Sequence, residues 1–406
     1  MNSFIRQITV DQLQVGMFIT EGNNNWVPDK NFSRQGLVTR SEVIEQIRAL
    51  GVESLYIDTS KGKDCEPQTQ SNTSDQQNGK KASSKQQQTS QLPAPKVSVS
   101  QEMENAKKIQ QEATALIGRC MADIKVGKVI DVAPVTDMAS DMVESLTQNH
   151  NALTCVTQLR EKDRYLMEHS FNVSVLMGIL ASSMGYKGNT LEEIVTGALL
   201  HDIGKIRIDD KVLHKPGKLT DDEWVEMKNH VTYGEDVLSN SKGISQIIID
   251  ICAQHHERLD GSGYPRGLSA DEIPIHSRMA AIVDVYDAIT ADRVYHKGMA
   301  PTQALKKLME WSSEGQLDQQ LIYQFIQAIG VYPAGTVVEL DNQKLAIVTE
   351  ANPSEQNKPK VLQMYDLRLR RYDNRYAIDL ADERCGRHIV KAVYPSTYKI
   401  KLSDFV

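Results

Sequence analysis

The stretch Gln254–Pro265, which reads Gln-His-His-Glu-Arg-Leu-Asp-Gly-Ser-Gly-Tyr-Pro, places metal-binding side chains immediately before a turn. Adjacent His255 and His256 are followed by carboxylates at Glu257 and Asp260. Imidazole and carboxylate together suit divalent transition metals, including zinc, iron and manganese. The glycines and the proline that follow favour a tight, non-helical turn. This composition predicts the end of a helix that leads into a loop at the mouth of a pocket.

Length and charge limit the class of protein. A chain of 406 residues predicts two or three domains with enough apolar material for a core. The net charge of −7 argues against general phosphate neutralisation, so we expect no DNA or RNA binding. The five cysteines lack C-x-x-C spacing and fit a reducing cytosol. Without a signal-peptide pattern or an apolar run near 18 residues, we expect a cytoplasmic protein that does not enter the membrane.

The first hundred residues divide into two parts. Residues 1–60 predict a small α+β regulatory or interaction domain, with a strand within Ile8–Ile19, a helix over 39–51 and a closing strand over 52–58. Residues 61–100 are rich in Gln, Ser and Lys, with few apolar side chains to bury. Such a segment cannot offset the entropy cost of ordering, so we expect a disordered linker.

Residues 101–330 are predicted to be mostly helical. Apolar residues recur at three- and four-residue spacing over 103–124, and this stripe could pack on later helices or on a second subunit, which leaves a homodimer open. Further helical patterns cover 137–148, 163–184, 191–200, 221–239, 244–254, 277–290 and 302–311. From residue 331 to 406 the pattern changes to short strands, at 335–340, 345–349 and 360–365, which predicts a β-rich C-terminal appendage.

Several helices carry further candidate ligands. His201 and Asp202 follow an apolar helix, and the Asp202 carboxylate could bridge two metals. Asp284 and Asp287 are three residues apart and therefore share one helical face. One of them could bind metal while the other orients water or a ligating histidine. The remaining candidates, each on a predicted helix, are His169 and His230.

Three motifs carry a resemblance to a known family: His201-Asp-Ile-Gly-Lys205, His255-His-Glu-Arg-Leu-Asp-Gly-Ser-Gly-Tyr-Pro265 and Asp284-Val-Tyr-Asp-Ala-Ile-Thr290. Over roughly residues 150–330 the chain resembles the HD-GYP family, a branch of the HD metal-dependent phosphohydrolases. Residues 1–60 resemble the small domain of unknown function that often precedes HD-GYP domains in bacteria. The resemblance implies a mainly α catalytic domain, an HD-type helical bundle, between the small α+β domain and the β-rich extension.

The resemblance also implies a ligand set and a cofactor. Asp202 would be the bridging carboxylate, and the cofactor would be divalent metal, usually iron and often manganese. Members with three metals carry a glutamate one turn before the first ligating histidine, where this chain has Tyr165, so a two-metal site is expected. The implied ligands are His169, His201, Asp202, His230, His255, His256 and Asp284.

Family members hydrolyse cyclic di-GMP to linear pGpG and often on to GMP, and some prefer cyclic GMP-AMP. The implied function is cyclic dinucleotide hydrolysis, in which a metal-bridging hydroxide attacks phosphorus in line with the departing 3′ oxygen. Lys205 would contact a phosphate oxygen, and Asp287 would hold the water or a protonated group. Arg293 and Lys297 would bind the other phosphate. The Gly-Tyr-Pro loop would shape the pocket rim or meet a protein partner.

Two alternatives remain beside the active phosphodiesterase. One is a catalytically idle receptor that senses the nucleotide and signals through residues 1–60. Such a receptor should have lost ligands, whereas this chain retains each of them except the glutamate replaced by Tyr165. The other is an HD hydrolase of a different phosphoester, such as a nucleotide, against which the Gly-Tyr-Pro stretch argues only by analogy.

Overall fold

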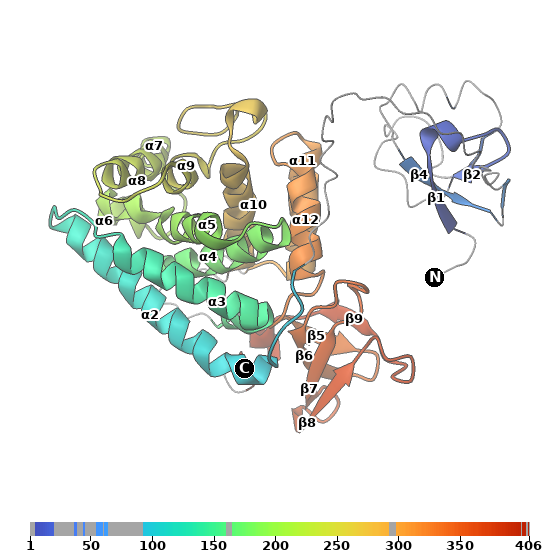
Figure 1. Cartoon of the computed structure of the whole chain (residues 1–406). Helices are drawn as coiled ribbons and strands as arrows, with labels where there is room; N and C mark the ends of the chain where they lie inside the picture. Colours follow the sequence, from blue (N-terminus) through green and yellow to red (C-terminus); the bar gives the residue numbers. More distant parts are fainter. Residues whose placement is uncertain are drawn as a thin grey trace, which may run out of the picture. The chain divides into compact units, whose positions relative to one another are not determined.

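The chain forms two compact units, Met1–Lys85 and Gln86–Val406. The computed structural model, drawn in Figure 1, describes residues 5–19, 36–38, 44, 54–59, 61–63, 92–159, 165–291, 298–398, 400–402 and 405. The helix expected over 39–51, apart from the helical Ile44, lies outside the described residues, as does most of the expected linker over 61–100.

The first unit contains a small antiparallel sheet in the order β1-β4-β2-β3. The strands are β1 (Ile5–Thr9), β2 (Phe18–Ile19), β3 (Gly36–Leu37) and β4 (Ser54–Asp58). A strand was expected in the second half of Ile8–Ile19, but only Phe18 and Ile19 pair there. A 3-10 turn over Val10–Gln12 and the positive φ of 100° at Gly16 interrupt extended backbone before Phe18.

The second unit begins with a helical domain. Its longest helix begins after Ser98, whose side chain accepts from the Gln101 amide in a capping box. The α-helices are α2 (Val99–Lys125), α3 (Ala133–Val156), α4 (Tyr165–Ser183), α5 (Gly188–Leu200), α6 (Asp210–Leu213), α7 (Asp221–Lys228), α8 (His230–Ser239), α9 (Gln246–Gln254), α10 (Ile275–Thr290), α11 (Pro301–Ser313) and α12 (Gln319–Ile329), and the short 3-10 helix η4 spans Ile203–Arg207.

Helix α4 lies inside this domain and packs against α2, α5, α10 and α12 (Figure 1). Every residue from Glu168 to Ala181 is buried, so the helix is enclosed on nearly all sides. Most of these side chains are apolar, and Phe171 is fully buried among them. Truncating a buried phenylalanine to alanine typically costs about 3–5 kcal/mol. The helix therefore holds any polar side chain that it carries in a fixed place.

The expected helix over 221–239 is two helices instead of one. Helix α7 ends at Lys228 and α8 begins at His230. Between them the Asn229 amide donates to the Glu226 carbonyl at 3.0 Å, a tighter i−3 turn that interrupts the α-helical pattern. The break places His230 in the first turn of a new helix.

The chain ends in a five-stranded antiparallel sheet in the order β8-β7-β6-β5-β9. Alternate residues of β5 join separate apolar clusters, Val337 in one and Val338 in the other, so both faces of the sheet are covered. Strands β8 and β9 were not expected from the sequence. The strands are β5 (Val337–Leu340), β6 (Lys344–Glu350), β7 (Lys360–Asp366), β8 (Arg371–Asp379) and β9 (Ile389–Ala392).

The structure confirms the expected mainly α architecture with a β-rich C-terminal part and small N-terminal strands. The helices end at Ile329 and the sheet begins at Val337. The expected domain limits at residues 60, 100 and 330 remain predictions. Within the described ranges, none of the helices combines the length and the apolar character needed to cross a bilayer.

Candidate metal centre

Polar side chains converge where helices of the second unit end or begin. His201 follows the last residue of α5, and His255 follows the last residue of α9. His230 opens α8. His169 and Asp284 come instead from the interior of α4 and α10. Helix termini suit this role because their main-chain carbonyls are free to fix side chains.

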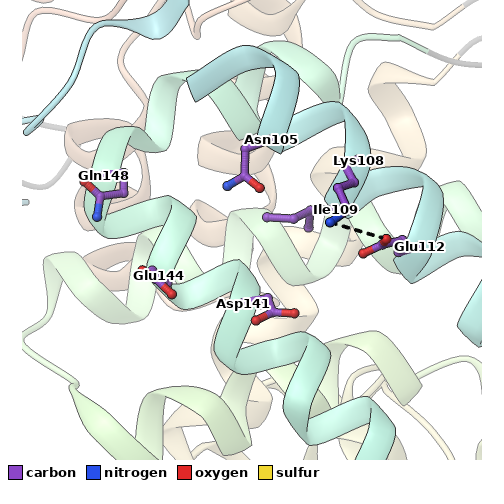
Figure 2. Close-up of a pocket in the computed structure, with 7 residues that line it drawn as sticks. All are labelled: Asn105, Lys108, Ile109, Glu112, Asp141, Glu144 and Gln148. Atoms are coloured by element: carbon purple, nitrogen blue, oxygen red, sulfur yellow. Dashed lines mark ion pairs between the residues drawn. The ribbon is translucent and has the colours of Figure 1, made fainter. Parts of the chain in front are cut away.

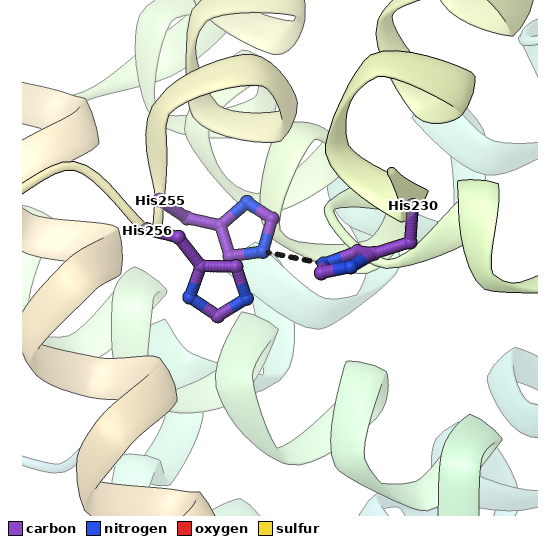
Figure 3. Close-up of side chains that lie close together, drawn as sticks. All are labelled: His230, His255 and His256. Carbon is purple, nitrogen blue, oxygen red and sulfur yellow. Dashed lines mark hydrogen bonds between the residues drawn. The ribbon is translucent and has the colours of Figure 1, made fainter. Parts of the chain in front are cut away.

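The structure brings these side chains into two adjoining clusters of potential metal ligands. In each cluster the ligand atoms lie within 4.8 Å of one another. Figure 3 shows the three imidazoles of the second cluster, with His255 and His256 from one chain segment facing His230 from another. The clusters are His169 with His201 and Asp202, and His230 with His255 and His256.

The Asp202 carboxylate lies between the clusters, with one oxygen toward each. Its Oδ2 is 3.5 Å from the Nε2 atoms of both His169 and His201. Its Oδ1 is 3.4 Å from His230 Nε2 and 3.9 Å from His255 Nε2. A carboxylate in this position can bind one cation through each oxygen.

Asp284 spans the clusters in the same way. Its Oδ1 is 3.0 Å from His169 Nε2 and 3.9 Å from His201 Nε2. Its Oδ2 is 3.7 Å from the Nδ1 atom of His256. The seven residues that the family resemblance implied as ligands therefore meet at one place.

Hydrogen bonds fix the direction in which the imidazoles face. A carbonyl oxygen can only accept, so each ring nitrogen next to one must carry the proton, which leaves Nε2 with its lone pair free. His169 has a different partner, because its Nδ1 lies 2.8 Å from Asp287 Oδ2. The Nδ1–H to carbonyl pairs, at 2.7–2.8 Å, are His201 with Ala198, His230 with Met227 and His255 with Cys252.

Burial keeps most of these histidines neutral. It lowers the pKa of His230 to about 4 and that of His255 to about 3. Burial also acts to lower the pKa of His169, but the carboxylates of Asp284 and Asp287 outweigh it and raise that pKa to about 9. Neutral imidazole is the form that binds metal.

The donor set fits divalent metal. Asp202 is 1% exposed, and its Oδ1 has no hydrogen-bond donor. The buried Nε2 of His201 also has no hydrogen-bond partner. Leaving such atoms unsatisfied costs about 1–3 kcal/mol each, and more for a charged group. Divalent cations held by the two clusters would satisfy these atoms. Nitrogen and oxygen ligands of this kind suit iron, manganese and zinc without selecting one.

A lysine joins the cluster from the side. Lys205, in η4, places its Nζ 2.5 Å from Asp202 Oδ2 and is 21% exposed. Burial acts against ionisation of Asp202, but Lys205 and the surrounding histidines hold the pKa of that carboxyl well below its usual range. The two other expected phosphate-binding residues, Arg293 and Lys297, lie outside the described residues.

Two carboxylates of the opening motif do not join the clusters. Glu257 accepts from the main-chain amides of Arg266 and Leu268, at 2.8 and 3.0 Å, and so ties down the Gly-Tyr-Pro loop. Asp260 accepts from the amide and hydroxyl of Ser262, at 3.0 and 2.6 Å. Their place in the sequence suggested metal ligation, but the chain turns after His256 and carries both away.

Two tyrosines contact the ligating histidines. The Tyr165 ring stacks on the His169 ring, with centroids 6.0 Å apart. The Tyr264 ring lies against the His256 ring at 4.7 Å. The sequence identified both positions, Tyr165 as a replacement for glutamate and Tyr264 as part of the loop, but no periodic signal predicted these ring contacts.

The structure also has a shallow depression away from the clusters, between α2 and α3 (Figure 2). Its volume is about 190 Å³, and the ion pair Lys108–Glu112, at 3.8 Å, lies across part of it. The described residues that line it include no histidine, cysteine or aromatic side chain, so it offers none of the chemistry of the metal clusters. The lining residues are Asn105, Lys108, Ile109, Glu112, Asp141, Glu144 and Gln148.

Three family models match the chain in succession. Residues 5–135 match a domain of unknown function (DUF3391), residues 135–321 match the HD domain, and residues 337–401 match a KOW domain associated with the HD domain. The HD match covers every residue of the two clusters.

Individual known proteins are also similar to this chain. A cyclic di-GMP phosphodiesterase of Pseudomonas aeruginosa is 32% identical over 366 residues, which cover 90% of this chain and 86% of that protein. The 3′3′-cGAMP-specific phosphodiesterase 2 of Vibrio cholerae is 42% identical over 142 residues, 35% of this chain and 27% of that protein. A solved HDG“Y”P protein from Bdellovibrio bacteriovorus, 19% identical, covers 79% of this chain and 98% of its own, with a TM-score of 0.47. With its three successive domain matches and a relative similar over nearly its whole length, this chain belongs to the HD-GYP family.

Proposed function

We propose that this chain is a metal-dependent phosphodiesterase that opens a cyclic dinucleotide, with cyclic di-GMP as substrate and linear pGpG as first product. The observation that carries the proposal is the position of Asp202 and Asp284, each with one oxygen toward each histidine cluster. Relatives named as phosphodiesterases of cyclic di-GMP and of 3′3′-cGAMP support this class of substrate.

The ligand set supports two divalent cations, iron or manganese, one at each cluster. Such cations stabilise charge on phosphoryl oxygens and allow water to act as a nucleophile at neutral pH. In the net reaction the water oxygen bonds to phosphorus, the bond from phosphorus to the 3′ oxygen breaks, and that oxygen takes a proton. The chain contributes the orientation of every ligand and the exclusion of bulk water from a buried site.

We propose that Lys205 binds substrate directly. It is the cation next to Asp202 and is partly exposed, so its ammonium can contact a phosphate oxygen at the cluster. Asp287 acts through another residue, since its carboxylate holds His169 by Nδ1 on the side away from the clusters. We therefore assign Asp287 to positioning of His169 rather than to contact with the attacking water. Arg293 and Lys297 are proposed to bind the second phosphate.

Metal content and products test the proposal together. The protein would be purified without oxygen in the presence of Fe(II) or Mn(II), its metals counted, and products from cyclic di-GMP and 3′3′-cGAMP separated by chromatography. We expect two metals per chain and linear pGpG. Tight nucleotide binding with no product from either substrate would favour the idle receptor instead.

A pair of double variants tests the site. His201→Ala with Asp202→Ala should abolish turnover while leaving the helical circular dichroism signal intact. The matched control is His276→Ala with Asp250→Ala, because that partly buried His–Asp pair, 3.2 Å apart, joins α10 to α9 in the same domain but lies outside the clusters. Full turnover in the first double variant would end the assignment.

A further inference from the structure

An exposed tryptophan lies beside the metal centre on the side of the Gly-Tyr-Pro loop. Trp224, on α7, is 48% exposed, and its ring contacts the ring of Tyr264 edge to face, with centroids 6.3 Å apart. We propose that Trp224 forms a stacking platform for a purine base of the substrate. This inference rests on the proposed function and adds to it a residue that recognises the base.

Ring contacts connect Trp224 to the metal ligands. Tyr264, which Trp224 touches, lies 4.7 Å from His256 and 6.5 Å from His230, measured between ring centroids. The indole is therefore one aromatic ring away from the second cluster. A base attached to a phosphodiester held at the clusters would extend into this neighbourhood.

Folding does not explain the position of the indole. Helix α7 has no buried residue, and its neighbour Val225 is 57% exposed. The helix is held instead by its capping box, in which Thr220 and Glu223 bond each other's main-chain amides at 3.3 and 2.7 Å. Tryptophan side chains are on average highly buried. An indole that is half exposed beside a polar site therefore suggests that a ligand covers it.

The chemistry of the platform suits a nucleotide. Trp224 and Tyr264 meet edge to face, and the tryptophan remains 48% exposed, so aromatic surface is left for a base. Lys228, one turn after Trp224, holds its Nζ 5.8 Å from the centre of the Tyr264 ring and brings a cation to the same rim. Bases stack on aromatic side chains whatever their sequence, and each stack is typically worth about 1–3 kcal/mol.

Kinetics with two substrates test the platform. Trp224→Ala in the metal-loaded full-length protein should raise KM for the cyclic dinucleotide by on the order of 10-fold, with kcat nearly unchanged. Trp224→Phe should restore most of the affinity. Hydrolysis of the abasic analogue, a cyclic diester of two ribose phosphates that carries no base, should be the same in Trp224→Ala as in the wild type. Val225→Ala, exposed on the same helix, is the matched control and should change neither substrate.

A binding measurement separates this inference from the proposed function. The chain has three tryptophans, Trp26, Trp224 and Trp311. With Trp26→Phe and Trp311→Phe, fluorescence reports Trp224 alone, and cyclic di-GMP should quench it to saturation whether or not turnover occurs. If cyclic di-GMP quenches the fluorescence but no product forms, the proposed phosphodiesterase activity is wrong and the stacking of a base on Trp224 is still supported.

Three outcomes would overturn the platform: no quenching at saturating nucleotide, an unchanged KM in Trp224→Ala, or equal losses on both diesters. Equal losses on both diesters would mean that Trp224 only supports the Gly-Tyr-Pro loop. Unchanged KM with loss of a protein complex would identify the indole as a docking surface for a partner protein.

Discussion

Two buried aspartates, one in the helical domain and one in the C-terminal sheet, have opposite surroundings. Asp366, 4% exposed, is the last residue of β7 and accepts from the amides of Arg368 and Leu369 at 2.9 and 3.0 Å, with Lys344 Nζ at 3.0 Å. Asp202, 1% exposed, meets Lys205 through Oδ2, while its Oδ1 has no donor. The carboxylate of the sheet completes a turn, whereas that of the helical domain has one oxygen without a donor and can bind a cation.

The comparison shows that burial of a charge does not by itself identify a functional site. What distinguishes the helical domain is a carboxylate oxygen surrounded by imidazole lone pairs instead of N–H groups. In the protein without metal this oxygen lacks a hydrogen-bond donor, and a bound cation would supply its missing partner. The following substitutions test that difference.

The largest effect is expected from Asp202→Asn. The amide keeps the shape but loses the charge that would join two cations, so turnover should fall by more than about 100-fold, since even residues that only support ligands are worth 10–100-fold. Metal counting measures the loss of bound metal, and product analysis measures the loss of turnover. The metal-free variant should unfold at a lower temperature than the metal-free wild type, because Lys205 and the surrounding histidines lower the pKa of Asp202 and its charge therefore contributes to stability. Wild-type metal content in Asp202→Asn would contradict the assignment of Asp202 as a ligand.

Gly204→Ala should cost about 3 kcal/mol of unfolding free energy. A Cβ at Gly204 would overlap the main chain of α8 at His230 and Gly234, and main chain cannot move aside as a flexible side chain can. The change would displace Asp202 and His230 together, so activity should fall with stability in denaturant titrations. Gly118→Ala is the matched control, since its Cβ meets nothing within 4 Å on α2, and it should stabilise the helix slightly.

Asp287→Asn should weaken metal binding by about 10- to 100-fold while leaving the clusters in place. Asparagine can still accept from His169 Nδ1, but without the negative charge it no longer raises the basicity of the ring nitrogen that would bind the metal. Isothermal titration with Mn(II) gives the affinity directly. Unaltered affinity together with lost turnover would instead favour direct contact of Asp287 with the reacting water.

Metal uptake should release a proton from His169. Its pKa of about 9 means that the ring is protonated at pH 7.5, and it must become neutral to bind metal. Apparent metal affinity should therefore rise with pH up to about 9, and the heat of binding should vary with the ionisation enthalpy of the buffer. In Asp287→Asn less proton should be released. A buffer-independent heat in the wild type would contradict this.

The smallest effect is expected in the sheet, where Asp366→Asn should leave turnover unchanged. Amide hydrogen bonds from Leu369 and the contact with Lys344 lower the pKa of Asp366 to about 2. A lowered folded-state pKa means that the carboxylate stabilises the fold above its unfolded pKa of about 3.8, and that this contribution is lost as pH falls toward 2. Melting curves of wild type and variant should thus converge at low pH. If the two melting curves still differ at low pH, the charge of Asp366 is not the cause of the difference in stability.

The sequence predicted the helical part well where apolar spacing was regular. The stripe over 103–124 became α2, and the patterns over 191–200 and 244–254 became α5 and α9. It failed at Asn229, because the break depends on a local hydrogen bond that spacing does not encode. It also missed β8, an edge strand whose residues are nearly all exposed, so that no alternation of apolar and polar side chains marks it.

The sequence by itself determined which side chains could bind metal. Its residue types give the imidazoles and carboxylates, and the spacing of its apolar residues indicates which of them lie at helix ends. Only the tertiary structure decided that Asp202 faces both clusters, that Asp287 turns to His169, and that Glu257 ties down a loop. These are contacts between residues up to 118 positions apart. The packing of α4, α5, α8, α9 and α10 sets the first two contacts, and no local pattern records which face of one helix meets another.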